Sequence, residues 1–280
     1  MKTWRTHRTV IPDFSLQNIP DFPATRFFDG LSFIGNEVLG CFPLETEEGI
    51  VLLDCMLPDK DSERCIEKGF ADLGLDIREL RAIVITHGHG DHYGNADRFK
   101  AKYGTKIYMG ETDYQTAHHP PAGFPWRPLD CACDHFLQDG ELLRFGNVWI
   151  KCVLTPGHTP GCFSLILPVT DEGVPHTAAL WGGSGILPSS DVTAYQQSLV
   201  KFTEECRANH VDCEIATHPC LDNGLERLNV VRRIVDGIPN PFVLGEDGYR
   251  YYEQQFYALA KRHASKSVEH GQSIKGETKR

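Results

Sequence analysis

The feature that most constrains this chain is the stretch VITHGHGDHYGN, residues 84–95, with four metal-ligand side chains in six positions: His87, His89, Asp91 and His92. The preceding run RAIVIT is rich in β-branched residues and too short for a helix, which predicts a strand that leads straight into the cluster. Histidines two residues apart cannot share one face of a helix, whereas a loop can turn both toward one point. The intervening glycines leave such a loop free of Cβ crowding. The sequence therefore predicts a metal-binding loop at the end of a strand.

Nitrogen and oxygen donors of this kind suit zinc or a similar borderline divalent ion. A single tetrahedral ion could hardly use all four ligands from so short a segment, whereas two ions sharing the loop could. These residue types leave open whether the ion in the cell is zinc, iron or manganese.

Strands and helices are expected to alternate along the chain, which indicates an α/β fold. Each ligand-rich motif lies just past the end of an expected strand, where open sheets usually place their chemistry. We expect an N-terminal arm over residues 1–25, one domain over residues 26–264 and a flexible polar tail over residues 265–280.

Composition excludes several classes of function. A formal net charge of −10 argues against nucleic acid as a partner, because phosphate binding needs a basic surface. No apolar run reaches the length of a membrane helix, and the N-terminus lacks the apolar core of a signal peptide. Ten cysteines without a CxxC pair suit a reducing compartment, so a cytoplasmic protein is expected. The expected partner is a small-molecule substrate, and a homo-oligomer is compatible with these features.

The motif THGHGDH resembles the HxHxDH signature of the metallo-β-lactamase superfamily, and it lies after a strand as in that family. The family has a further histidine some tens of residues later, which TPGHTPG supplies as His158, and a last one that ATHPCLDNG supplies as His218. The motifs occur in order between about Leu31 and Ile234. The resemblance implies a four-layer αβ/βα sandwich.

The resemblance also implies two metal ions per chain, with the ligand set of the third subclass of metallo-β-lactamases. The first ion would be held by His87, His89 and His158, and the second by Asp91, His92 and His218. Glyoxalase-type hydrolases and lactonases of this fold carry a metal-bridging Asp after the strand that follows TPGH. Here that stretch reads TAALWGGSGIL, with Gly182, Gly183 and Ser184 at this place, which favours the β-lactamase-like subclass.

The expected function is that of a dinuclear zinc hydrolase in which a metal-bound hydroxide cleaves a lactam, lactone, amide or ester, with Asp91 orienting the nucleophile. One alternative is a mononuclear iron oxygenase of the same fold, as in persulfide dioxygenases, although the complete second ligand set argues against it. A lactonase or thioesterase is another alternative. A binding protein that has lost activity would lack some of the six ligands, and none is lost.

Four residues are candidates for substrate binding. Phe124 and Trp126 lie in a proline- and aromatic-rich stretch, Gln115 to Phe136, that is expected to form a lid. Tyr93 follows the last clustered ligand and either faces the pocket or packs beneath the loop. Ser184 lies in the GGSG turn, near where β-lactamases of the third subclass bind the substrate carboxylate.

Overall fold

The structure, a computed structural model, describes residues 19–233 and 237–277 of the chain. The strands form two sheets, a seven-stranded sheet in the order β1 to β7 and a five-stranded sheet in the order β12-β11-β10-β9-β8. The first sheet contains β1 (Asp21–Phe28), β2 (Leu31–Asn36), β3 (Gly40–Thr46), β4 (Gly49–Leu53), β5 (Leu80–Val84), β6 (Lys106–Met109) and β7 (His135–Phe136). The second contains β8 (Leu142–Phe145), β9 (Val148–Leu154), β10 (Phe163–Asp171), β11 (Val174–Leu180) and β12 (Cys213–Ile215).

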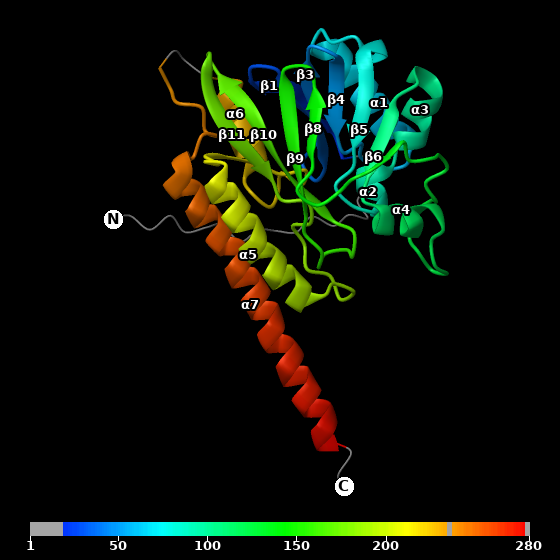
Figure 1. Cartoon of the computed structure of the whole chain (residues 1–280), viewed down its shortest axis with the longest axis vertical. Helices are drawn as coiled ribbons and strands as arrows, with labels where there is room; N and C mark the ends of the chain where they lie inside the picture. Colours follow the sequence, from blue (N-terminus) through cyan, green and yellow to red (C-terminus); the bar gives the residue numbers. More distant parts are fainter. Residues whose placement is uncertain (1–18, 234–236, 278–280) are drawn as a thin grey trace.

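Most of the helices lie on the outer faces of the two sheets (Figure 1), whereas Leu228 of α6 joins the core between them. They are α1 (Lys60–Asp72), α2 (Gly90–Tyr93), α3 (Ala96–Tyr103), α4 (Glu111–His118), α5 (Val192–Ala208), α6 (Gly224–Val231) and α7 (Gly245–Glu277), with a 3₁₀ turn at Ile77–Glu79. Helices α1 and α3 pack on the first sheet, and α5 and α7 lie side by side on the second. The expected four-layer α/β sandwich is thereby confirmed.

The core between the sheets is aromatic and aliphatic, because alternate residues of each strand point inward. Phe27 and Phe42 from the first sheet, and Leu165 and Ala178 from the second, all contribute to it. Phe242, from the segment before α7, packs on Phe27 with ring centroids 4.5 Å apart. This core fixes how the strand ends of the two sheets face each other.

Strand direction brings the chemistry to one end of the sandwich. Strand β5 pairs in parallel with β4, and Leu53 aligns with Val84, so the segments after both strands leave the sheet side by side. In the second sheet, β11 and β12 are also parallel, and Leu180 aligns with Ile215. The loops that follow these four strands therefore meet at one edge.

The structure adds three details to the less regular segments. Strand β1 begins at Asp21, inside the predicted arm, while residues 1–18 lie outside the described part of the chain. Helix α7 continues to Glu277 through most of the predicted flexible tail, where no proline interrupts the sequence. Helix α4 includes the first residues of the expected lid. The domain boundaries at residues 25 and 264 stay predictions.

Within residues 19–233 and 237–277, none of the helices combines the length and the apolar character that a membrane crossing requires.

The aromatic contact of Phe242 gives a test of the inter-sheet core. Phe242 is 3% exposed, and Phe242→Ala removes its packing against Phe27. We expect the free energy of unfolding to fall by about 3–5 kcal/mol, the usual cost of truncating a buried Phe. Urea unfolding measures it, with Val174→Ala as the control because Val174 is 54% exposed. Equal effects of the two variants would show that this core is not the main stabilising layer.

Candidate metal centre

The loop after β5 presents the clustered ligands in two directions. His87 follows the strand directly and is 1% exposed. His89 lies at the N-terminal boundary of the single-turn helix α2 in an extended conformation, with φ −89° and ψ 145°. Asp91 and His92 follow within that helix and are both buried. The change from strand to extended loop to helical turn separates the first two histidines from the second pair of ligands.

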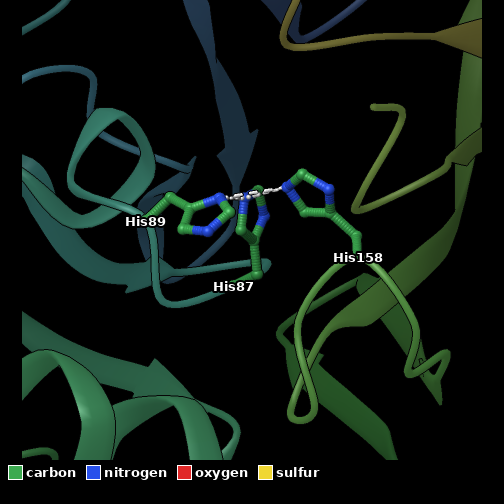
Figure 2. A group of neighbouring side chains, drawn as sticks. All are labelled: His87, His89 and His158. Carbon is green, nitrogen blue, oxygen red and sulfur yellow. Dashed lines mark hydrogen bonds between the residues drawn. The ribbon is translucent and has the colours of Figure 1, made fainter. Parts of the chain in front are cut away.

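His158 completes a group of three imidazoles with His87 and His89 (Figure 2). Nε2 of His158 lies 3.1 Å from Nε2 of His87 and 3.0 Å from Nδ1 of His89, and the latter two nitrogens are 3.1 Å apart. Three nitrogens bound to one tetrahedral zinc ion, each at about 2.0–2.1 Å, lie about 3.3 Å from one another. The geometry of this first trio therefore fits a single ion.

A second group joins Asp91 and His92 to His218. The Nε2 atoms of the two histidines are 3.2 Å apart, and Oδ2 of Asp91 lies 3.7 Å from that of His92 and 3.6 Å from that of His218. Oδ1 of Asp91 is buried and has no hydrogen-bond partner within the described part of the chain. A buried carboxylate oxygen without a partner is costly, and an ion bound at Oδ2 together with its water would supply the missing partner. The second trio thus also fits a metal ion.

Asp54 orients His92 by contacting the ring nitrogen that faces away from the second trio. Its Oδ2 lies 2.7 Å from Nδ1 of His92, and its two oxygens also accept hydrogen bonds from Thr86 N, at 2.7 Å, and Thr86 Oγ1, at 2.9 Å. The Asp54 backbone has a φ of 58°, an uncommon value for this residue type that the surrounding bonds maintain. Because Nδ1 of His92 faces this carboxylate, Nε2 is left to face the second trio.

Backbone carbonyl groups orient two of the other imidazoles. Nδ1 of His158 lies 2.7 Å from the carbonyl oxygen of Gly185, and Nδ1 of His218 lies 3.0 Å from that of Val38. Each contact fixes the tautomer and turns the opposite nitrogen toward its trio.

Asp113 connects the loops that carry the first trio. Its carboxylate accepts hydrogen bonds from Gly88 N at 2.7 Å, Gly161 N at 2.6 Å and Thr159 Oγ1 at 2.5 Å. Burial raises the pKa of Asp113, while these three donors act in the opposite direction. Neither Asp113 nor Asp54 was identified from the sequence. Asp54 directly follows the apolar run GIVLL, a signal that could have found it, whereas Asp113 lies in α4 among ordinary polar residues.

The loop that carries His218 is held by a buried ionic group. Arg227 of α6 pairs with the carboxylates of Glu214 and Asp222, and its guanidinium lies 4.4 Å from the ring centroid of Phe242. Glu214 belongs to β12, before His218, and Asp222 follows it. The two contacts therefore fasten both sides of the His218 loop to α6.

Close packing explains why glycine occupies positions 182 and 183. A Cβ atom on Gly183 would lie 2.3 Å from Cβ of His158, and one on Gly182 would lie 1.9 Å from the carbonyl oxygen of Phe163. Neither position has room for a side chain. Phe163 of β10 and His158 therefore leave no space for a carboxylate side chain at these two positions.

Burial and mutual repulsion determine the protonation of the histidines without a bound ion. Burial, followed by repulsion from neighbouring imidazoles, lowers the pKa of His87 well below its usual value. Burial likewise lowers the pKa of His89 to about 4 and that of His158 to about 3. Burial also acts to lower the pKa of His92, but the Asp54 and Asp91 carboxylates together raise it. The first trio therefore presents neutral nitrogens at neutral pH, the form that binds metal.

The structure places Trp126 of the predicted lid against His89 of the first trio. Its ring lies 4.9 Å from the His89 ring, at 37° between planes, and Phe124 packs edge-on against it at 5.3 Å. A Cβ atom on Gly90 would lie 2.3 Å from Cγ of Trp126, so glycine is required for this contact. The two aromatic residues thus lie beside the first trio.

The other two substrate candidates have structural contacts. Tyr93 is 1% exposed, and its hydroxyl donates to the carbonyl oxygen of Arg127 at 2.8 Å, which favours packing beneath the loop. Ser184 is 6% exposed, and its carbonyl oxygen accepts a hydrogen bond from the Tyr195 hydroxyl at 3.1 Å. Substrate contact by either residue stays a prediction.

We compared the chain with family models, with curated proteins and with solved structures. Residues 41–171 match the family described as the Metallo-beta-lactamase superfamily. A hydroxyacylglutathione hydrolase, GloC, of Haemophilus influenzae is 28% identical over 155 residues, 53% of this chain and 66% of that protein. A probable polyketide biosynthesis zinc-dependent hydrolase, PksB, of Bacillus subtilis is 34% identical over 85 residues, 30% of this chain and 32% of that protein. The chain thus spans less than two thirds of the length of these curated relatives.

Solved structures match over more of the chain. BJP-1, a subclass B3 metallo-beta-lactamase of Bradyrhizobium japonicum, has a TM-score of 0.78 and 20% identity, covering 90% of this chain and 96% of that one. The FEZ-1 metallo-beta-lactamase of Legionella gormanii has a TM-score of 0.79 and 22% identity, covering 90% and 98%. Likeness at these identities shows a shared fold.

The lowered pKa values predict how the metal-free chain responds to acid. In the unfolded chain these histidines bind protons below the usual histidine pKa of about 6.5. In the folded chain buried His89 binds its proton only near pH 4, and buried His158 only near pH 3. Stability of the chelator-treated protein should therefore fall as pH drops from about 6.5 to about 4. His92 has the opposite effect, because its pKa is raised in the folded chain. The stability that it contributes is lost as the pH rises.

Urea unfolding across this pH range measures the effect. The variant His158→Gln should show a weaker dependence on pH between 6.5 and 4 than the native chain. An equally steep dependence in both would assign the acid sensitivity to other groups.

Proposed function

Because residues 41–171 match the metallo-β-lactamase superfamily and the fold is that of the metallo-β-lactamases, we propose that the chain is a dinuclear zinc hydrolase that cleaves a lactam, lactone, amide or ester. The observation that carries the proposal is the pair of adjacent trios, since His87 of one and His92 of the other have ring centroids 3.9 Å apart. Two ions held on so short a loop would lie beside each other, as dinuclear hydrolysis requires.

The donor set supports zinc. In the proposed assignment, His87, His89 and His158 hold one ion through three neutral nitrogens, and Asp91, His92 and His218 hold the other. Mixed nitrogen and carboxylate ligands are usual for catalytic zinc, and three protein ligands leave a position open for water or substrate. When bound, two zinc ions supply a water of lowered pKa as the nucleophile and polarise the carbonyl group that is attacked.

Asp91 is the residue of this chain that we assign to proton handling. Its Oδ1 atom has no partner among the described residues and is free to accept a hydrogen bond from the attacking water. The surrounding histidines lower the pKa of Asp91 although burial acts to raise it, so the carboxylate stays ionised. An ionised Oδ1 orients the water and receives its proton.

The missing bridging carboxylate favours a β-lactamase-like centre over the glyoxalase type, because Gly182 and Gly183 leave no room for that side chain. Trp126 and Phe124 would form an apolar wall beside the first ion and contact the substrate. A cytoplasmic location fits the ten cysteines, all of which are unpaired.

The direct experiment is a hydrolysis screen of the zinc-loaded protein across lactams, lactones, esters and thioesters. The proposal predicts turnover of at least one class that stops when a chelator removes zinc and returns when zinc is restored. Dioxygen consumption that requires iron, without hydrolysis, would contradict the proposal and support the oxygenase alternative.

Replacement of Asp91 tests its assigned role. Asp91→Ala removes a ligand of the second ion and the acceptor for the nucleophile, so we expect turnover to fall by on the order of 10² or more. Asp61→Ala is the matched control, since the Asp61 side chain is 86% exposed and far from the site in sequence. Steady-state kinetics with metal content measured for each variant decides the matter. Near-normal turnover of Asp91→Ala would show that the chemistry runs on one ion.

The lid assignment has its own test. Trp126→Ala should raise KM or change the preferred substrate by a factor that corresponds to about 1–3 kcal/mol, while both ions remain bound. Trp126→Phe keeps an aromatic ring against His89 and should have the smaller effect. A lower melting temperature with unchanged kinetics would make Trp126 a purely structural residue.

A further inference from the structure

A third cluster of potential metal ligands lies at the opposite ends of β11 and β12 from the candidate centre. It consists of His176, near the start of β11, with Asp212 and Cys213 at the start of β12. His158 lies near the residues that follow β11, and His218 follows β12, so both are near the other ends of these strands. The strand from His176 to Leu180 alone spans about 13 Å, so the cluster is a separate site.

The carboxylate of Asp212 lies between the other two side chains. Its Oδ2 is 2.6 Å from Nδ1 of His176, and its Oδ1 is 3.4 Å from Sγ of Cys213. One ligand atom from each residue lies within 4.8 Å of the other two. Small shifts from these positions bring all three atoms to a common ion, for which typical bond lengths are about 2.0–2.3 Å.

Backbone contacts hold the three residues in place. Asp212 N donates to the carbonyl oxygen of Thr177 at 3.1 Å, and Thr177 N donates back to Oδ1 of Asp212 at 3.0 Å. Leu244 N donates to the carbonyl oxygen of Asp212 at 2.8 Å. The cluster is therefore tied to β11 and to the segment that leads into α7, which limits the reorganisation that ligand binding would need.

The cluster is accessible from one side. The side chains of His176 and Asp212 are 15% and 20% exposed, whereas Cys213 is buried behind them. Both exposed residues line a surface pocket of about 320 Å³ together with His210 and Glu246. Nδ1 of His210 lies 3.2 Å from Oε1 of Glu246. These two residues add a nitrogen and an oxygen ligand atom to the lining of the same pocket.

We propose that His176, Asp212 and Cys213 bind a divalent ion of the zinc class, separate from the dinuclear centre. One nitrogen, one oxygen and one sulfur form a ligand set that zinc and cobalt accept and that magnesium and calcium do not favour. The ion would link the starts of β11 and β12, on the second sheet, to the segment before α7. We assign the ion a structural role, because it would join these three segments of the chain.

Binding must release one proton, since the ligand is the thiolate. The S–H bond of Cys213 breaks, the sulfur bonds to the ion, and the proton leaves to solvent; His176 binds through Nδ1 as the neutral Nε2–H tautomer. Burial, followed by the nearby Asp212 carboxylate, raises the pKa of Cys213 above its usual range. The affinity should therefore increase with pH.

Cobalt(II) titration of the full chain tests this site independently of hydrolysis. Cobalt bound to a thiolate gives a charge-transfer band in the near ultraviolet, and the six ligands assigned to the dinuclear centre contain no sulfur. The expected result is such a band, about one bound cobalt per chain associated with it, and its loss in Cys213→Ser. Cys220→Ser is the matched control, because Cys220 lies two residues from His218 and should keep the band.

A second variant covers a failure of Cys213→Ser to fold, since Cys213 is buried. His176→Gln changes a partly exposed residue and should weaken cobalt binding at this site at least tenfold while hydrolysis stays normal. Absence of the band in the native chain with excess cobalt overturns the proposal. So does a band that persists in Cys213→Ser, or cobalt affinity that is unchanged in His176→Gln. Loss of hydrolytic activity alone would concern the dinuclear centre instead.

Discussion

The packing of the two sheets against each other is the constraint on which the candidate centre depends. Each trio takes two residues from the segment that follows β5 of the first sheet, and one from a loop of the second sheet. His158 follows β9 and His218 follows β12. Neither trio can form unless the core between the sheets sets their distance and register. Inward-pointing aromatic residues such as Phe27, Phe42 and Phe242 therefore contribute to the geometry of the candidate centre although they lie outside it.

Two buried carboxylates convert this packing into a defined ligand geometry. Asp54 fixes the segment after β5 and orients His92, and Asp113 fastens Gly88 to the loop that contains Gly161. Both are fully supplied with donors, which offsets the cost of burying a charged group. Asp91 differs because one of its oxygens is buried without such a donor among the described residues. Asp54 and Asp113 therefore support the candidate centre, whereas Asp91 is the carboxylate that would bind metal and water.

The residues of the two trios could be singled out from the sequence because they are concentrated in short motifs directly after strands, and the structure brings them together. Spacing and glycine content identified the loop at His87 to His92, and the resemblance to a known family added His158 and His218. Supporting residues were missed because their roles depend on contacts across the fold. Asp113 lies in α4 and binds loops that are distant in sequence, and Arg227 of α6 holds Glu214 and Asp222. The contact of Trp126 with His89 likewise depends on how a proline-rich segment folds back, which no local periodicity encodes.

The central claim is that two adjacent trios bind two ions in one hydrolytic centre. A crystal structure of the zinc-loaded protein, with anomalous scattering recorded at the zinc edge, tests it most directly. The account predicts one peak within bonding distance of His87, His89 and His158, and a second within bonding distance of Asp91, His92 and His218. A single peak in the first trio, with Asp91, His92 and His218 bonded to no metal, would contradict it.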